Sequence, residues 1–467
     1  MSDPISAGIV AGGASEVTIN GVVYQGTAYS TISSSMSANT VTAASNVADA
    51  KKISFDNSAQ TVAIKDTTFS NLSASYYACV LAKGTFIGEN LIFENNVATT
   101  STGAIYGDGT SVIYLNKVFF NGNTAASNSG AVRVKNEFFI TGGTFYKNVV
   151  NNGSAGGLQV DSTAGGTVSN TSFTGNTATN GGAIYNSGAL LLDNVSFSAN
   201  TASNSGNAIY HYGTSLTIKN SSFGENQSIY NNGKTIVFNG TITLAASVVG
   251  SSACVYKVDG VDFVFNNTSD IQLSNFVNAG ETSGINSVTF KNSALVKFAQ
   301  QDLSNVSITV ADGTLGNVAT GVTLADNQSV TYGDVTVKIN SGILNADKET
   351  VSMVSYSGST ISVKKADKIS VDGSGNDFDE FAALNDVFAK YDGFAGECNV
   401  SVATTLSEIN LAAVINSSAA ITVNGTVTMD GGAIYGGSFR KHCDRQLRYG
   451  KSYCNNFQQQ CRCIFIC

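Results

Sequence analysis

The sequence predicts an all-β fold, namely a right-handed parallel β-helix (a solenoid with about 26 residues per coil) with a small α+β insertion. Only 12% of the 467 residues are charged, one is proline and 48 are glycine. This composition suits continuous sheet, because proline cannot donate to a β ladder. The segments between the repeats alternate β-branched, aromatic and polar residues, carry Asn-Gly turn signals and lack an amphipathic helix.

A repeat supplies the period of the coil. The tetrapeptide Phe-x-x-Asn recurs at intervals of 24 to 28 residues, each time followed by Gly-Ala-Ile-Tyr or a near relative. This period is too short for a globular domain and fits one coil of short strands, stacked about 4.8 Å from the next coil. The repeats begin at Phe93, Phe120, Phe145, Phe173, Phe197 and Phe223.

The repeated residues are expected to build the scaffold. Phenylalanines at one position of successive coils stack inside the solenoid, and each asparagine bonds its counterparts in the coils above and below. Glycine before Ala-Ile allows a tight corner where a Cβ would clash, with Ile pointing inward and Tyr outward. The scaffold residues are Phe93, Asn96, Phe120, Asn123, Phe145, Asn148, Phe173, Asn176, Phe197, Asn200, Phe223, Asn226, Gly103, Gly130, Gly157, Gly182 and Gly206.

Five segments follow from these patterns. The stretch at 344–425 is predicted to be an α+β insertion or lobe, because it holds more charge and 379–393 has helical spacing. From 235 to 343 we expect a degenerate continuation of the same coil. The segments are 1–50 (N-terminal strands or cap), 51–343 (β-helix, clearest at 90–230), 344–425, 426–439 (a resumed coil) and 440–467 (a tail).

The joint repeat of GGA[ILV], as in TGAIY at 102–106, and FxxN resembles the polymorphic outer membrane proteins first described in chlamydiae and similar autotransporter-like surface proteins. The resemblance covers 50–240 strongly and returns at 426–439. It implies the β-helical passenger of a large adhesin at the bacterial outer membrane or outside the cell. It also implies a signal peptide and a translocating β-barrel in the full-length gene. Neither is found in this chain, which also has no apolar run of transmembrane length, so we expect a truncated fragment.

The expected function is therefore non-catalytic adhesion to a host-cell or neighbouring-cell receptor or glycan, through rows of outward Tyr, Asn and Thr side chains. A net charge of −8 gives no footprint for nucleic acid. Two alternatives stay open: a β-helix polysaccharide lyase or hydrolase, and a self-associating structural surface protein. An enzyme is disfavoured because Arg133 and His211 are the one Arg and one His before residue 440. We interpret Arg133 as an exposed substitution in the tyrosine slot and His211 as an outward or corner residue.

One loop is a candidate metal site. Asp372, Ser374, Asn376 and Asp377 offer oxygen donors, and Gly-x-Gly-Asn-Asp resembles one unit of the calcium-binding nonapeptide repeats. Those repeats bind calcium between successive copies, whereas this chain has one copy. A solvated turn is the alternative to calcium, and no other cofactor is expected.

The last 28 residues change composition, with four arginines and five cysteines against one arginine and three cysteines in all that precedes them. A zinc site would use Cys443, Cys454, Cys461, Cys463, Cys467 and His442, but their spacing fits no standard tetrahedral cluster. A frameshift explains the segment better. With suitable codons, RKHCDRQLRY read one nucleotide later gives Gly-Asn-Thr-Ala-Thr-Asp-Asn-Ser-Gly, which continues the repeat. Residues 440–467 are therefore predicted to be a frameshifted, disordered tail.

Overall fold

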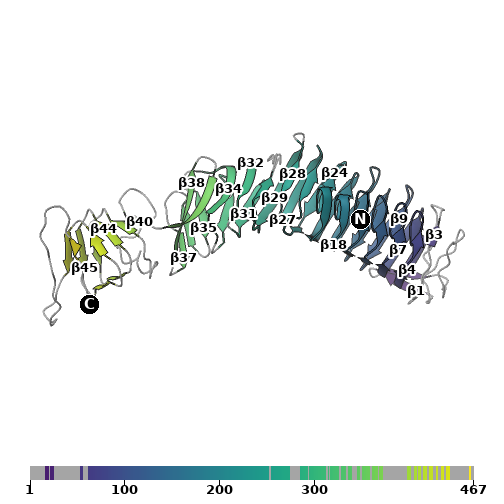
Figure 1. The fold of residues 1–467 in the computed structure, drawn as a ribbon, viewed down its shortest axis with the longest axis horizontal. Coiled ribbons are helices and arrows are strands. Elements are labelled where there is room, and N and C mark those ends of the chain that lie inside the picture. The colour runs from purple at the N-terminus through teal and green to yellow at the C-terminus, as the bar shows by residue number, and fades with distance from the viewer. Residues whose placement is uncertain are drawn as a thin grey trace. The chain divides into compact units, whose positions relative to one another are not determined.

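The computed structural model describes residues 61–251 and 254–273, with short gaps 284–371 and 397–441, and strands within 16–25, at 53–55 and at 462–463. These residues form strands and no helix (Figure 1). The chain divides into two compact units, Met1–Asn286 and Ser287–Cys467. In the first unit the strands of successive coils pair in parallel with one another, about one sequence repeat apart along the chain. The predicted β-solenoid is therefore confirmed.

Three sheets run along the first unit, and each strand pairs with the equivalent strands one coil before and one coil after. Sheet 1 contains β3 (Ile53–Phe55), β6 (Val80–Ala82), β9 (Ile105–Gly107), β13 (Val132–Val134), β17 (Leu158–Val160), β20 (Ile184–Asn186), β23 (Ile209–His211), β26 (Ile229–Asn231), β28 (Val248–Gly250) and β30 (Ile271–Leu273). Its strands are short and parallel.

Sheet 2 carries the longest strands, whereas four of the six strands of sheet 3 have two residues. Sheet 2 contains β4 (Thr61–Ser70), β7 (Thr85–Glu94), β10 (Val112–Asn116), β11 (Phe119–Asn121), β14 (Glu137–Thr141), β15 (Thr144–Tyr146), β18 (Gly165–Thr174), β21 (Ala189–Ser198), β24 (Ser215–Lys219), β25 (Ser222–Phe223), β27 (Thr235–Leu244) and β29 (Val255–Phe265). Sheet 3 contains β5 (Ser73–Ala74), β8 (Val97–Ala98), β12 (Thr124–Ala125), β16 (Val149–Val150), β19 (Thr177–Asn180) and β22 (Thr201–Ser205). A separate hairpin joins β1 (Glu16–Ile19) and β2 (Val22–Gln25).

Phenylalanine rings form a continuous stack inside the coils, at the end of each sheet 2 strand. Neighbouring centroids lie 4.5 to 5.4 Å apart, with interplanar angles of 21° or less. This spacing matches the separation of adjacent strands, so the register of the sheet imposes the stacking. The stack contains Phe69, Phe93, Phe120, Phe145, Phe173, Phe197 and Phe223, all fully buried.

The asparagine of each repeat lies in the turn from sheet 2 into sheet 3 and bonds the coils on both sides. Asn148 donates through Nδ2 to the Asn176 Oδ1 at 2.9 Å and to the Phe120 carbonyl at 3.0 Å. Its own Oδ1 accepts from the Asn123 side chain and backbone, at 2.9 and 3.1 Å. The side chain is fully buried. The ladder therefore satisfies turn backbone that has no strand partner.

The final rung of this ladder differs from the prediction. Asn226 is exposed with φ at 61°, whereas Gln227 is buried and its Oε1 accepts from the Asn200 Nδ2 at 2.8 Å. In earlier coils the left-handed residue lies two positions after Phe, as at Asn95 (φ 53°). After Phe223 it lies three positions on, because the turn holds one more residue. Because of this extra residue, Asn226 takes the left-handed position, and Gln227 occupies the ladder position that asparagine holds in the earlier coils.

Glycine is required at the corner that enters sheet 1. A Cβ at Gly103 would lie 1.8 Å from the Gly130 carbonyl oxygen, and one at Gly130 would lie 2.4 Å from the Gly156 oxygen. Each corner thus packs directly on the backbone of the next coil, leaving no space for a side chain.

The predicted set of corner glycines is off by one residue in two coils. The strand register makes Gly156, not Gly157, the equivalent of Gly130, because the sequence there contains two adjacent glycines. Asn207, not Gly206, occupies the same position one coil later. Gly206 instead adopts φ 72° in the turn before the corner.

Sheet 3 ends at β22, within the first unit. Residues 224–228 lead directly from β25 to β26, and the coils shorten. Partners one coil apart are 24 to 28 residues apart along the asparagine ladder, but 20 apart where Asn239 bonds Asp259. In the described part of the first unit, the coils beyond 235, which we expected to continue the same coil in degenerate form, therefore show two sheets instead of three.

The second unit mixes parallel and antiparallel pairing. Parallel pairs join β31 (Ile285–Phe290) to β33 (Ser307–Val310), β33 to β35 (Ser329–Tyr332), and β32 (Val296–Asp302) to β34 (Gly316–Thr323). Antiparallel pairs join β35 to β36 (Val335–Lys338), β34 to β39 (Thr360–Ala366), β38 (Thr350–Ser357) to β39, and β37 (Leu344–Asp347) to β38. Tyr356 Oη donates to the Val322 carbonyl at 3.0 Å, which ties this antiparallel group together.

Stacked parallel coils return at the end of the described chain. They comprise β40 (Lys368–Val371), β41 (Glu397–Val400), β42 (Thr404–Leu406), β43 (Ile409–Leu411), β44 (Val414–Ser417), β45 (Ala420–Val423), β46 (Val427–Met429), β47 (Ala433–Tyr435) and β48 (Ser438–Lys441). The described part of 344–425 is strand throughout and partly solenoid, and the helical part of the predicted α+β lobe stays a prediction. The expected helix at 379–393 lies outside the described residues.

The predicted tail, residues 440–467, contributes described residues to two strands. β48 continues through Lys441, and β49 (Arg462–Cys463) pairs antiparallel with β47. At these residues the backbone is paired, in contrast to the predicted disorder. The zinc candidates Cys443, Cys454, Cys461 and Cys467, with His442, lie outside the described residues.

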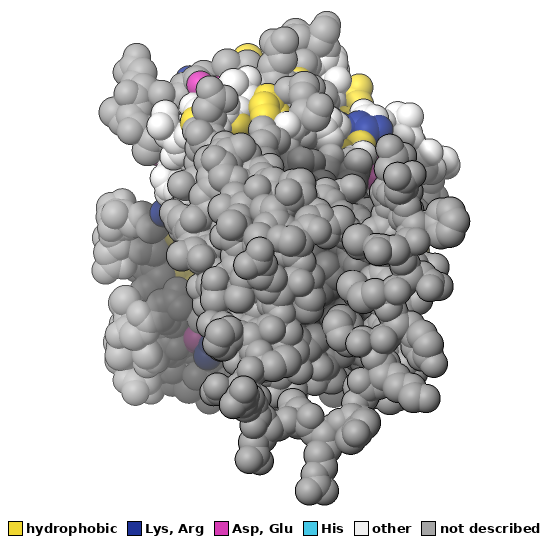
Figure 2. Space-filling view, turned by 90° about the vertical axis from the view of Figure 1, so that its left-hand side faces the viewer, with side chains coloured by type: hydrophobic (Ala, Val, Ile, Leu, Met, Phe, Trp, Pro, Cys, Tyr) yellow, Lys and Arg dark blue, Asp and Glu magenta, His cyan; other side chains and the backbone are white. Residues whose placement is uncertain are grey.

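Among the coloured side chains visible in Figure 2, hydrophobic and uncharged groups predominate and a few are charged. This agrees with the low charge content of the whole chain. A local cluster of charges on such a surface therefore stands out, and one occurs on sheet 1.

Candidate functional site

The outer face of sheet 1 is the candidate site. In its three-residue strands the first and third residues point into the core and the middle residue points outward, because side chains alternate along a strand. Register pairing aligns these middle residues in a column, and a second column follows two residues later in each coil. The first column is Leu81, Tyr106, Arg133, Gln159, Tyr185, Tyr210, Tyr230 and Val249; the second is Lys83, Asp108, Lys135, Asp161, Ser187, Tyr212, Asn232 and Ser251.

One half of this face is aromatic. Tyr185, Tyr210 and Tyr230 stack with centroids 5.1 Å apart at each step. Because the rings cover each other's faces, the row presents ring edges and hydroxyls to solvent. Tyr212, in the second column, is 50% exposed, and the Lys234 Nζ lies 5.0 Å from its ring centroid.

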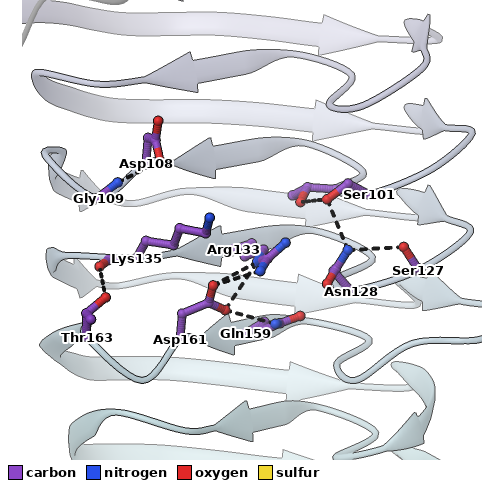
Figure 3. A network of polar contacts seen from close by, with 11 residues as sticks. Ser101, Asp108, Gly109, Ser127, Asn128, Arg133, Lys135, Gln159, Asp161 and Thr163 are labelled. Atoms are coloured by element: carbon purple, nitrogen blue, oxygen red, sulfur yellow. Dashed lines mark hydrogen bonds and ion pairs between the residues drawn. The ribbon is translucent and has the colours of Figure 1, made fainter.

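The other half is charged. Arg133 occupies the tyrosine column, but its side chain is 15% exposed and bound, so the predicted exposed substitution is wrong. Its Nη2 lies 2.7 Å from the Asp161 Oδ2, and its Nε donates to both carboxylate oxygens at 3.1 Å (Figure 3). The Arg133 guanidinium also lies 5.6 Å from the Tyr106 ring centroid, and the Lys135 Nζ lies 5.4 Å from it. Stacked coils therefore bring together residues about 28 positions apart.

His211 is buried, contrary to the outward or corner position expected for it. It is the third residue of its strand, and alternation turns that position into the core. Gly213 N–H donates to Nδ1 at 3.3 Å, so the proton is assigned to Nε2, which donates to the Thr235 carbonyl at 3.2 Å. Burial lowers the pKa of His211 to about 4. The ring is thus a neutral scaffold element.

The calcium candidates Asp372, Ser374, Asn376 and Asp377 lie outside the described residues, so their loop stays a prediction. Among the residues that the structure does describe, His, Cys, Asp and Glu form no group of three or more suited to a metal. Cys79 and Cys254 are buried free thiols, and burial raises the pKa of Cys79. Within the same described part, no helix is long and apolar enough to cross a membrane.

Sequence reasoning missed the second column of the face. Lys83, Asp108, Lys135 and Asp161 occupy it in consecutive coils with alternating sign. The alternating Lys and Asp residues stand two positions after each outward residue in the sequence. They can be recognised as one column only once the register of the coils is known.

Comparison with known proteins gives no assignment, since no family model, curated protein or solved structure matches this chain.

Proposed function

We propose that this chain is a non-catalytic scaffold of a bacterial surface adhesin, of the polymorphic outer membrane protein type, which binds host or neighbouring cells through the outer face of sheet 1. The motif resemblance supports the adhesin class. The observation that carries the binding face is the aligned row Tyr185, Tyr210 and Tyr230, which places polar ring edges at one-coil intervals. Tyrosine gives large contact area with little loss of conformational entropy, which suits a recognition surface.

Regular spacing favours a repetitive or extended partner. Each coil adds one similar contact along the axis, so weak contacts sum when several are made together. The polar network that touches this row supports the same role. The Asn232 side chain donates to the Tyr210 hydroxyl at 3.3 Å, which fixes the edge of that ring. A fixed edge loses less freedom on binding than a mobile one.

The arrangement of the residues weighed for catalysis supports the non-catalytic choice over the lyase or hydrolase. A lyase needs a basic group free to take a proton, and a hydrolase needs carboxylates facing one groove. The Arg133 guanidinium already donates hydrogen bonds to Asp161. His211 is buried, and both of its ring nitrogens are hydrogen-bonded to the scaffold. Incubation of the full chain with acidic polysaccharides, followed by assay for reducing or unsaturated ends, tests this choice, and release of either would overturn it.

Adhesion is tested by saturable binding of the labelled full chain to cultured cells, measured by flow cytometry. The triple variant Tyr185→Phe, Tyr210→Phe, Tyr230→Phe keeps the stacked rings and removes the hydroxyls. Each lost hydrogen bond weakens binding by about 0.5–1.5 kcal/mol, so we expect a loss of at least about tenfold in affinity. Tyr114→Phe is the matched control, since that ring stacks on Phe139 at 5.1 Å on the outer face of sheet 2. Absence of saturable binding, or an equal loss in the control, would contradict the proposal.

A further inference from the structure

The charged half of the sheet 1 face has a composition that the scaffold does not require. Neighbouring coils fill the same column with tyrosine, yet β13 and β17 place Arg133 and Gln159 there and follow them with Lys135 and Asp161 (Figure 3). We call Tyr106 and these four residues the cation cluster. Solenoid stability gains little from such a substitution, because partly exposed ion pairs contribute weakly.

The cluster carries an unbalanced positive charge. Its two cations, Arg133 and Lys135, face one carboxylate, Asp161, which leaves an excess of one positive charge. Arg133 binds that carboxylate by a bidentate contact, with its Nη2 2.7 Å from the Asp161 Oδ2. Asp108, one coil before Lys135 in the second column, forms no ion pair with it among the described residues and accepts from the Gly109 N–H at 2.8 Å. Lys135 therefore keeps its charge available on a protein whose net charge is −8.

A buried acceptor within the cluster also lacks a donor. Gln159 is 6% exposed, and its Nε2 donates to the Asp161 Oδ1 at 2.9 Å. Its Oε1 has no hydrogen-bond partner in the described part of the chain. Rotating the amide would place Oε1 against the carboxylate, so this orientation is fixed. An unpaired buried carbonyl is costly, and a hydroxyl or N–H from a bound molecule would satisfy it.

An aromatic wall borders the cluster. Tyr76 is 45% exposed and packs edge-to-face on Tyr106, with centroids 5.4 Å apart and an interplanar angle of 86°. The Tyr106 ring in turn lies against both cations. A ligand beside Tyr106 meets a cation and an apolar surface together.

We infer that the cation cluster binds a carboxylated sugar, a sialic or uronic acid, presented on a cell-surface glycan. Lys135 pairs with the sugar carboxylate, and the apolar face of the ring packs on Tyr76. A shift of the Gln159 side chain, whose Oε1 is buried in the unbound chain, lets that atom accept from a ring hydroxyl or amide. Charge-assisted hydrogen bonds supply the strength, and the orphan acceptor supplies selectivity for a hydroxylated acid over a simple anion. This inference rests on the proposed adhesin function and names the chemistry that the face recognises.

The test is calorimetric titration of the full chain with sialyllactose, with glucuronic acid, with neutral lactose and with sodium sulfate. We expect binding of at least one acidic sugar that weakens as salt is added, no detectable binding of lactose, and weak or no competition by sulfate. Lys135→Gln should weaken the binding by about tenfold, the effect of one charge-assisted contact. Lys147→Gln is the matched control, because its Nζ also lies over a tyrosine ring, 4.9 Å from the Tyr146 centroid, on another strand. Melting temperatures verify that both variants are folded.

Three results would overturn the inference: equal binding of lactose and sialyllactose, equal displacement by sulfate, or full affinity in Lys135→Gln. Absence of any sugar binding would overturn it as well. Cell binding measured in parallel separates the two proposals. A chain that adheres to cells but shows no preference for acidic sugars retains the adhesin function and loses this inference. A chain that does neither contradicts both.

Discussion

The first unit contains two kinds of coil, and the repeated motif belongs to one of them. Coils that end in a sheet 3 strand, up to β22, carry the stacked phenylalanines, the asparagine ladder and the corner glycines. In the described coils from β26 to β30 no third strand is present, and Gly-Ala-Ile-Tyr is absent, although Phe263 and Asn266 match the Phe-x-x-Asn tetrapeptide. The motif therefore encodes a corner of the cross-section and is not needed for the parallel stacking itself.

The turn between sheets 2 and 3 explains the difference. In three-sheet coils a left-handed residue turns the chain after Phe, and the buried asparagine then bonds the backbone that the turn leaves open. Small side chains line the interior under sheet 3, namely Ala98, Ala125, Val150 and Ala178. In the next coil Leu244 takes the Phe position and is followed by the buried Ala245 and Ala246, and Phe265 takes that position one coil later. Asn267, though buried, bonds locally to the Ser269 carbonyl.

The largest expected effect tests the asparagine ladder within the three-sheet coils. Asn148→Ala leaves the Phe120 carbonyl and the Asn123 backbone N–H without partners in a buried place. Each such group costs about 1–3 kcal/mol, so we expect about 4 kcal/mol of lost stability in urea denaturation. The comparison variant is Asn226→Ala, whose side chain is exposed and off the ladder. Alanine is disfavoured at the left-handed φ of 61° found there, so we expect a cost of about 1 kcal/mol, well below that of Asn148→Ala. Similar losses in the two variants would show that the ladder does not end as described.

Much of the three-sheet region could be predicted from the sequence, because its period is carried by large side chains. Phe173 and Asn176 recur at coil spacing, so stacking and laddering followed from the repeat alone. The errors occur where a turn has one extra residue, as before Gln227, or where two glycines are adjacent, as at Gly156. Matching motif letters cannot show which of two neighbouring residues is aligned with the coils above and below.

The candidate site was less predictable. Arg133 could be placed in the outward column, but its partner Asp161 lies in the next coil, and that contact depends on the register. His211 was misplaced because the third residue of a short strand turns inward again. Loss of the third sheet could not be predicted from the sequence. A weakened motif is equally consistent with a degenerate three-sheet coil and with a two-sheet coil.

An intermediate effect is expected at His211, in the first strand of sheet 1 after sheet 3 ends. Its pKa is about 4 in the folded chain, below the ordinary value of 6.5. The unfolded chain therefore binds more protons between these values, and stability falls as the pH drops through that window. We expect a loss of up to about 3 kcal/mol at its acid end.

Asn186 and Asn231 occupy the same column in the coils on either side, so His211→Asn is the matched variant. It should unfold at a similar urea concentration to the natural chain at neutral pH and lose less stability on acidification. Parallel pH profiles for the two proteins would show that His211 does not titrate as the buried ring described here.

The smallest effect concerns the corner glycine and tests the comparison most directly. A Cβ at Gly130 would lie 2.4 Å from the Gly156 carbonyl oxygen, so Gly130→Ala must displace the next coil. Overpacking of this kind costs about 1–3 kcal/mol. The equivalent position one coil before the two-sheet region is already Asn207, whose Nδ2 donates to the Asn226 carbonyl at 2.8 Å.

A side chain fits at Asn207 because the following coil lacks the third strand and its corner. Asn207→Ala should therefore cost no more than its lost hydrogen bonds, about 1 kcal/mol, and should not disturb the fold. Hydrogen exchange of the neighbouring coils locates the damage. In Gly130→Ala, faster exchange should concentrate in β13 and β17, the strands that meet at this corner. If Gly130→Ala leaves exchange unchanged, or if Asn207→Ala is the more disruptive, the corner glycine is not what sets the three-sheet coils apart.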